Sequence, residues 1–519
     1  IKYVAPDDEE AHGLYLRELC TWEESAYSHP ILSAVRAYVE GKTIITDLLN
    51  CGIIKANTVH EDKTIKQMIR WRVDGCEPEE PDCWKNRKLF SLFQDYYDSV
   101  ICDRDRALCM VNGKMDLPAA KHPCGVVSNL YRAKLISAND GSGFTYRGRF
   151  LDERQAATVG YIASQKAHNA LRWLASEQGV REFSGKRIFL CWNPEGKTIP
   201  RPMRRVRSAE AEPVRKPSEY KKQLQGTLLS FRKDHQLKDT DRAVLVSLDA
   251  ATTGRLAVTY YNEIGLGTFL RRMEDWDGHC CWYAGKSDIQ APNLLDIVDC
   301  AFGVERDKKL TTDGNVLGQH LQRLLQCKVD GGIFPLDILR ALTHRASSPL
   351  GYGKANWRKI MQTACAALQK YRYDTNQGGN EMAWALDKRD RSFQYGRLLA
   401  AMERVEEDYY YNKKKGNGKE DGQENRQTNA IKYMSEFRRR PFSVYERVNR
   451  HLQLAYLGRV EPWQAVRYKR LVGEIIGILR EFPEEELNRP LEDIYLMGYE
   501  LQRNAFFTKN QTDDNMEEE

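Results

Sequence analysis

The chain has 519 residues, of which 29% are charged and 41% hydrophobic, with a net charge of +6. A chain of this length is too long for one small core, so we expect two to four domains. No stretch approaches the roughly 18 consecutive apolar residues of a membrane span, and no signal peptide is visible, so we expect a cytoplasmic protein.

Residues 1–120 are expected to form a mostly helical N-terminal region. Helix-like apolar spacing occurs over residues 15–25, 29–38 and 86–100. Residues 75–82 are rich in proline and acidic side chains, which is typical of a loop.

Residues 121–332 are expected to form an α+β region. Apolar and β-branched runs predict strands over 130–136 and 188–192, and a polar loop with two glycines covers 137–143. Residues 152–175 and 268–276 have helical apolar faces. Strands over 243–248 and 255–261 are joined by the polar residues 249–254, which predicts a hairpin.

The most basic segment lies between residues 201 and 222. Pro202, Pro213 and Pro217, with Pro200 directly before the segment, keep it irregular, and its acidic residues are Glu210, Glu212 and Glu219. Its basic residues are Arg201, Arg204, Arg205, Arg207, Arg215, Lys216, Lys221 and Lys222. A solvated linker and a loop that tracks phosphates are both compatible with this composition.

From residue 333 onward almost every segment has a helical pattern. We expect a helical connector over 333–385 and a C-terminal helical bundle over 386–519, with helices over 335–345, 357–371, 391–407, 428–437 and 490–507. Ser443 and Glu446 are spaced as a capping box for the helix after Pro441. The expected fold class is therefore α+β, mixed in its N-terminal and central parts and all-α at its C-terminus.

The thirteen cysteines are scattered, and none forms a C-x-x-C pair. Reduced, mostly buried thiols are the favoured interpretation. A zinc site drawn from Cys76, Cys83, Cys102 and Cys109 is the alternative, although their spacings do not fit the usual zinc motifs. The cluster His279-Cys280-Cys281 is expected to be a helix-to-strand junction with buried cysteines.

No convincing catalytic constellation is present, so we expect a protein that is not an enzyme and holds neither cofactor nor metal. Gly41-Lys42-Thr43 resembles the end of a phosphate-binding loop, but Arg36 occupies the place of its first glycine. Aromatic residues often lie beside basic ones, as in Tyr131-Arg132 and Trp357-Arg358-Lys359. Arginine and lysine neutralise phosphates and aromatic rings stack on bases, so this pattern favours a nucleic-acid surface.

Five motifs, in a fixed order, carry a resemblance to a known family. They are AKLISAND at 133–140, LVSLDAATTGRLAV at 245–258, PLDILRAL at 335–342 with RAS at 345–347, LDKRDRS at 386–392 with YGRLLA at 395–400, and RQTNAI at 426–431. On these motifs the chain resembles the large subunit of the type I-C (Dvulg subtype) CRISPR surveillance complex, Cascade. The first 120 residues contribute little to this resemblance.

The resemblance implies a non-enzymatic subunit of an RNA-guided complex. Such a subunit recognises the protospacer-adjacent motif, assists duplex unwinding, stabilises the R-loop and helps to recruit a helicase–nuclease, while base pairing reads the rest of the target. The implied partners are backbone subunits bound to guide RNA, the subunit that caps the guide 5′ end, small subunits, target double-stranded DNA and its displaced strand. Met382 is a candidate internal start for a separately made small subunit that resembles the C-terminal bundle.

Three groups of residues are candidates for these contacts. For the adjacent motif they are Lys134, Ser137, Asn139, Arg147 and Arg149; for duplex phosphates Arg204, Arg205 and Arg207; for the displaced strand Arg391, Arg397, Arg426, Lys432, Arg438 and Arg439. Asn139 and Asp140 could instead form a capped turn, and the C-terminal arginines could be solvated or contact neighbouring subunits. A metal-dependent nuclease and a purely architectural subunit that binds guide RNA and protein remain the alternative functions.

Overall fold

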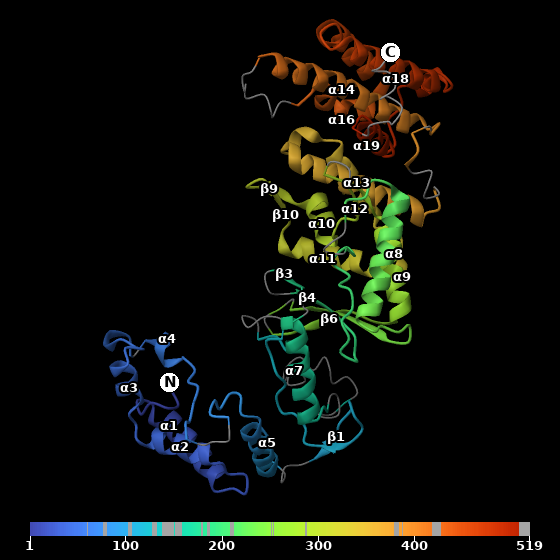
Figure 1. The fold of residues 1–519 in the computed structure, drawn as a ribbon. Helices are drawn as coiled ribbons and strands as arrows, with labels where there is room; N and C mark the ends of the chain where they lie inside the picture. Colours follow the sequence, from blue (N-terminus) through green and yellow to red (C-terminus); the bar gives the residue numbers. More distant parts are fainter. Residues whose placement is uncertain are drawn as a thin grey trace. The chain divides into compact units, whose positions relative to one another are not determined.

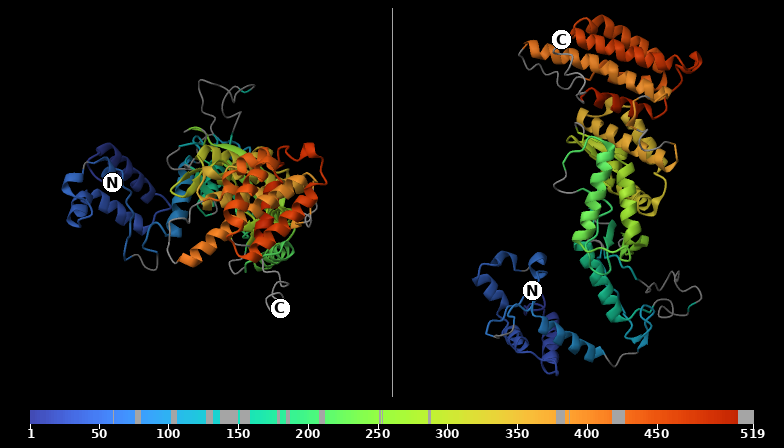
Figure 2. Two further views of the ribbon diagram at one scale, coloured as in Figure 1. Left: turned by 90° about the horizontal axis from the view of Figure 1, so that it is seen from above. Right: turned by 45° about the vertical axis from the view of Figure 1, so that its right-hand side comes forward.

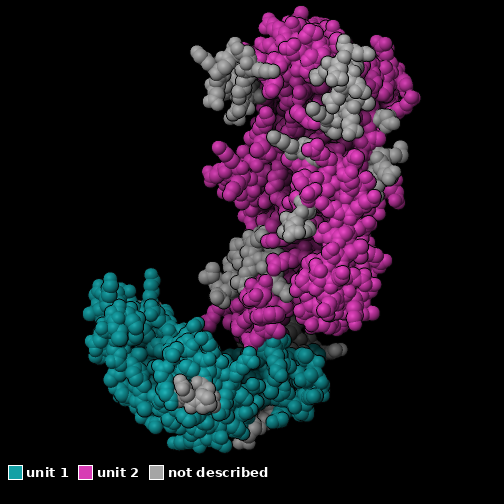
Figure 3. Space-filling model, viewed as in Figure 1, with its two compact units in different colours: residues 1–122, 138–167 teal, residues 123–137, 168–519 magenta. Residues whose placement is uncertain are grey.

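The computed structural model describes residues 1–59, 61–75, 80–101, 106–126, 132–136, 150, 158–177, 180–183, 187–207, 212–250, 252, 254–285, 288–377, 384–386, 388–417 and 427–507. The chain divides into two compact units (Figure 3): unit 1 holds residues 1–122 and 138–167, and unit 2 holds residues 123–137 and 168–519. The four-part division expected from sequence stays a prediction.

Unit 1 is mainly helical where it is described, with one small hairpin. Its elements are α1 (Glu9–Glu23), α2 (Pro30–Glu40), α3 (Ile44–Asn50), α4 (Asp62–Ile65), α5 (Arg87–Ile101), β1 (Ala107–Leu108) and β2 (Met115–Asp116). Asp8 starts α1 earlier than predicted because its carboxylate accepts a hydrogen bond from the Ala11 N–H. Apolar side chains of α1, α2 and α3, among them Leu19, Val35 and Ile44, form the core of this unit.

Unit 2 is built on an antiparallel sheet in the order β3-β4-β5-β6 (Figure 1). The strands are β3 (Val180–Phe183), β4 (Arg187–Trp192), β5 (Arg242–Asp249) and β6 (Ala257–Gly265). Leu190 lies opposite Val246, and Val246 lies opposite Tyr261. The predicted strand at 188–192 and the predicted hairpin are confirmed. α7 (Tyr161–Glu177) spans the division at residue 167.

The two faces of this sheet bury different sets of side chains, because successive strand residues point to opposite sides. Ile188 and Val246 pack with Leu174 of α7 in one core. Phe189 and Leu245 face the opposite side, toward a larger core that α8 (Pro217–Asp234) and α9 (Leu266–His279) also enter. Figure 2 shows α8 and α9 side by side.

The larger core continues from the sheet through all the helices that follow. The intermediate elements are β7 (Trp282–Ala284), β8 (Asp288–Gln290), α10 (Leu294–Phe302), β9 (Val304–Arg306), β10 (Lys309–Thr311), α11 (Gly314–Gln326), the π-helical turn η2 (Cys327–Gly331), α12 (Leu336–Ala346) and α13 (Lys354–Asp374). Trp276, Leu321, Ile360 and Leu398 all belong to one continuous cluster of buried residues. One buried cluster therefore links the sheet to the C-terminal helices.

The C-terminal residues form the expected all-helical region. Its elements are α14 (Arg391–Asn417), α15 (Asn429–Lys432), α16 (Met434–Arg439), α17 (Pro441–Leu452), η5 (Gln453–Leu457), α18 (Pro462–Leu479) and α19 (Tyr495–Ala505). The predicted α+β class with a helical C-terminal bundle is confirmed. Two local predictions are wrong. The helix expected over 428–437 is broken at Tyr433, and the Ser443/Glu446 capping box is absent because α17 already begins at Pro441.

Candidate nucleic-acid interface

The basic loop, residues 201–207, is held by hydrogen bonds to its backbone. The Arg205 N–H donates to Asn293 Oδ1 at 3.1 Å, and the Leu294 N–H donates to the Met203 carbonyl at 3.3 Å. The Val206 N–H donates to Asp277 Oδ2 at 2.6 Å. The sequence of this loop is compatible with a solvated linker, but these hydrogen bonds fix its backbone against α9 and the start of α10.

A buried ion pair lies beneath this loop. Lys328 Nζ is 2.8 Å from Asp277 Oδ1, and the two side chains are 1% and 0% exposed. The same ammonium donates to the Arg204 carbonyl at 3.4 Å. Lys328 lies in η2 and Asp277 in the last turn of α9, so two elements distant in sequence meet at the loop. Removing one partner would leave an uncompensated buried charge, which is strongly unfavourable.

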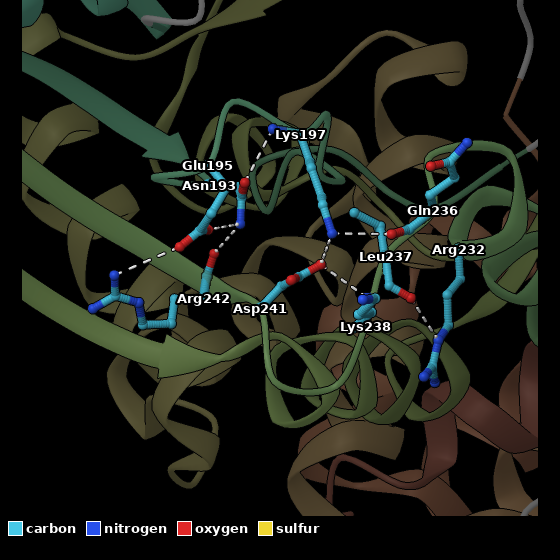
Figure 4. Close-up of polar contacts among 9 residues, drawn as sticks. All are labelled: Asn193, Glu195, Lys197, Arg232, Gln236, Leu237, Lys238, Asp241 and Arg242. Carbon is cyan, nitrogen blue, oxygen red and sulfur yellow. Dashed lines mark hydrogen bonds and ion pairs between the residues drawn. The ribbon is translucent and has the colours of Figure 1, made fainter.

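The segment that enters the loop is anchored as well (Figure 4). Lys197 Nζ lies 2.6 Å from Asp241 Oδ2 and donates to the Gln236 carbonyl at 3.1 Å. The amide of Asn193 donates to the Arg242 carbonyl at 2.9 Å. The Lys197 ammonium and the Lys238 N–H lower the pKa of Asp241, so its carboxylate stays charged at neutral pH. These contacts tie the end of β4 to the connection between α8 and β5.

The three predicted phosphate-contact arginines lie in this fixed loop. Arg204 is exposed, and Arg205 is half-buried, with its guanidinium 3.5 Å from the Ala291 carbonyl. Arg207 is exposed, and its guanidinium lies 3.5 Å from Asp288 Oδ2. Arg204 is therefore the best placed of the three to meet a polyanion.

The anchors of this loop were not found from the sequence. Lys328 lies in an amphipathic stretch with no motif, and Asp277 and Asn293 resemble ordinary helix-end residues. Only the long-range packing of η2 against α9 and the hydrogen bond between Asn293 and the loop reveal their role. No local signal in the chain could have indicated it.

Lys134, a predicted adjacent-motif residue, lies beside the sheet of unit 2. Its N–H donates to the Gly254 carbonyl at 3.2 Å, and its own carbonyl accepts from the Leu256 N–H at 2.9 Å. The half-buried side chain follows the buried Ala133. The motifs at 133–140 and 245–258 thus meet through their backbones. Ser137, Asn139, Arg147 and Arg149 lie outside the described residues.

Two of the residues predicted to bind the displaced strand are held within the C-terminal helices. Arg397 is 3% exposed, and its guanidinium donates to Gln502 Oε1, Gln394 Oε1 and Glu474 Oε1. Arg391 donates to the carbonyls of Arg489 and Pro490. Burial leaves Arg397 no surface to offer a DNA strand, so its visible role is to join α14 to α18 and α19.

The other candidates lie on α15 and α16. Arg438 pairs with Asp493 at 2.6 Å, whereas Lys432 and Arg439 are exposed. Arg440, which follows Arg439 and precedes α17, is exposed as well and was not among the predicted residues. We call Lys432, Arg439 and Arg440 the cationic edge. Arg426 and Met382 lie outside the described residues.

The part of the chain that the structure describes contains no group of three His, Cys, Asp or Glu side chains that could hold a metal ion. Cys83 is half-buried and Cys109 is buried, both as reduced thiols, while Cys76 and Cys102 lie outside the described residues. Cys280 and Cys281 are buried where α9 gives way to β7, as predicted, and burial raises the pKa of the Cys281 thiol to about 12. Among the described helices, none is long and apolar enough to cross a membrane.

The described residues define an α+β protein with a fixed basic loop and a cationic edge, a class of surface that can attract a polyanion. A family model described as CRISPR-associated protein (Cas_Csd1) matches residues 1–507. The chain therefore belongs to the Cas_Csd1 family of CRISPR-associated proteins, in agreement with the resemblance of its motifs. The comparison with curated proteins finds no match.

Proposed function

We propose that this chain is the large subunit of a type I-C RNA-guided DNA surveillance complex. The observation that carries the proposal is the match of a CRISPR-associated family over residues 1–507. In this role the chain recognises the protospacer-adjacent motif, assists unwinding, stabilises the R-loop and helps to recruit the helicase–nuclease. Its partners are the guide-RNA-bound backbone subunits, the subunit at the guide 5′ end, small subunits, target DNA and the displaced strand.

The fixed basic loop supports a contact to duplex phosphates. Phosphate contacts set the register of a protein on a duplex, and they are most effective when the cations are held in place before binding. Bonds to Asn293, Asp277 and Lys328 hold the loop backbone, and Arg204 is exposed on it. Adjacent-motif reading is assigned to Lys134 and to the predicted residues Ser137, Asn139, Arg147 and Arg149.

The proposal is tested with the reconstituted complex and two targets that differ only in the adjacent motif. Alanine at Lys134 and Asn139 is expected to weaken binding to the motif-bearing target and to reduce the preference between the targets by about 10-fold, since one good base contact contributes about 1–3 kcal/mol. Lys309→Ala, an exposed cation of β10, is the control. Unchanged affinity and preference in the double variant would refute the assignment of Lys134 and Asn139.

The proposed role is non-enzymatic and needs no cofactor. Incubating the purified chain with duplex and single-stranded DNA and Mg²⁺, Mn²⁺ or Zn²⁺ tests this directly. Intact DNA is the expected result, and metal-dependent cleavage that follows the protein through purification would favour a nuclease instead.

A further inference from the structure

A hollow between α8 and α9 carries positive charge that lies outside the predicted DNA contacts. It has a volume of 520 Å³ and is lined by Lys221, Gln225, Thr268, Arg271, Arg272, Glu274, Asp275 and His279, among others. Such a volume lies within the range of small-ligand sites. The hollow lies on the side of α8 that carries Lys221 and Gln225, whereas Tyr220 and Gln223 of the same helix face the basic loop at Arg205 and Arg207.

The three cations of the hollow have no carboxylate partner within the described chain. Arg271 donates to the Thr268 hydroxyl at 3.0 Å and is exposed, while Lys221 and Arg272 are half-buried. Desolvated or partly buried cations without a counter-ion bind anions more strongly than solvated surface lysines do. These side chains are therefore available for an anionic ligand.

The two carboxylates of the hollow accept hydrogen bonds from side chains other than its three cations. Glu274 Oε1 accepts from the amide of Gln225 at 2.7 Å, which links α8 to α9. Asp275 Oδ1 accepts from the Tyr373 hydroxyl at 3.4 Å, and its backbone carbonyl lies 2.7 Å from His279 Nδ1. Neither carboxylate forms an ion pair with Lys221, Arg271 or Arg272 among the described residues, so they do not neutralise the cations directly.

His279 closes the inner wall of the hollow as a neutral group. Its ring stacks on Tyr373 with 3.6 Å between centroids and 8° between planes. Burial lowers the pKa of His279, so the ring adds no charge at neutral pH. The positive charge of the hollow is therefore carried by Lys221, Arg271 and Arg272.

We infer that the hollow between α8 and α9 is a phosphate-binding site that holds the backbone of a nucleic-acid strand, through Lys221, Arg271 and Arg272 with the hydroxyl of Thr268. Guanidinium, ammonium and hydroxyl donors are the groups that bind phosphate oxygens in nucleic-acid complexes. This inference rests on the proposed function for the presence of nucleic acid, and it adds a contact that is distinct from adjacent-motif reading and from the basic loop.

The test is a salt titration of binding by the full chain to duplex DNA, single-stranded DNA and single-stranded RNA of one sequence. The variant is R271A/R272A. The matched control is R306A/K309A, which removes the same charge from exposed positions of β9 and β10. The variant is expected to bind the nucleic acid that occupies the site roughly 10- to 30-fold more weakly than wild type near physiological salt. The slope of log K against log salt is expected to be about 1.4–1.8 smaller in magnitude. The control keeps both close to wild type.

The three probes show which nucleic acid occupies the hollow. Only that nucleic acid should show the full loss of affinity and of salt slope in R271A/R272A. R271K/R272K keeps the charge and is expected to restore most of the affinity, which separates phosphate binding from a loss of structure. Equal affinity and equal slope for variant and control on all three probes would overturn the inference. Such a result would leave motif-dependent binding by the complex intact, so failure here is distinguishable from failure of the proposed function.

Discussion

Gly396 of α14 and Gly498 of α19 lie where the two helices cross at backbone distance. A Cβ atom on Gly396 would overlap the Tyr495 carbonyl and lie 2.8 Å from Tyr499 N, and one on Gly498 would overlap the Phe393 carbonyl. The obstructing atoms are backbone, so no side chain can move aside to make room. The glycine of the YGRLLA motif thus has a packing function: it brings α19 against α14.

Gly396→Ala is expected to destabilise unit 2 by about 1–3 kcal/mol, because the added methyl group forces the helices apart. Urea unfolding followed by circular dichroism measures the effect. Gly473→Ala is the control: Gly473 is exposed within α18 and has nothing within 4 Å of its Cβ position, so alanine there should stabilise by roughly 0.5–1 kcal/mol. Equal effects of the two substitutions would contradict the close crossing.

Local patterns predicted most elements of the fold but not the contacts that define the site. The apolar run at 188–192 predicted β4, and the helical face over 391–407 predicted α14 except its last turns. α15 ends at Tyr433, and no glycine or proline in the sequence marks this end. The sequence predicted a displaced-strand contact for Arg397, whereas its partners Glu474 and Gln502 come from α18 and α19. Long-range pairing of this kind leaves no periodic trace in sequence.

Lys328→Met is expected to destabilise the protein by about 3–5 kcal/mol, because it leaves Asp277 charged and buried without its counter-ion. The additional variant D277N/K328M removes both charges and should recover part of the loss, since an amide oxygen can still accept from the Val206 N–H. Thermal unfolding measures both. Lys309→Met, at an exposed position, is the control. A loss in the double variant as large as the losses of Lys328→Met and Asp277→Asn added together would refute the coupling.

Glu403 is expected to make stability depend on pH. Its carboxyl group accepts from the Tyr499 hydroxyl at 2.6 Å and lies in contact with the Arg503 guanidinium, and burial together with Glu407 raises its pKa to about 8. The folded state therefore holds a proton that the unfolded chain releases near pH 4.3, so stability falls as pH rises from about 4.3 to about 8. Urea midpoints across this range should fall less steeply in Glu403→Gln than in wild type.

A matched variant makes this pH test specific. Glu484 is exposed, so Glu484→Gln should leave the pH profile unchanged. Glu407 and Glu500 also have raised pKa values through burial, and their contribution has the same sign, so the profile of Glu403→Gln flattens only in part. Parallel profiles for Glu403→Gln and wild type would show that Glu403 titrates as an ordinary carboxylate.

The cationic edge, Lys432, Arg439 and Arg440, is exposed, and we expect it to contact the displaced strand. In the assembled complex on target DNA, R439A/R440A is expected to lower permanganate reactivity of the displaced strand by about 5-fold, because two phosphate contacts are lost while Arg438 still pairs with Asp493. The charge-matched R306A/K309A complex should react as wild type. Full reactivity in R439A/R440A would refute a contact between this edge and the displaced strand. Arg438→Ala would not make that distinction, because breaking its ion pair also loosens the segment that leads into α19.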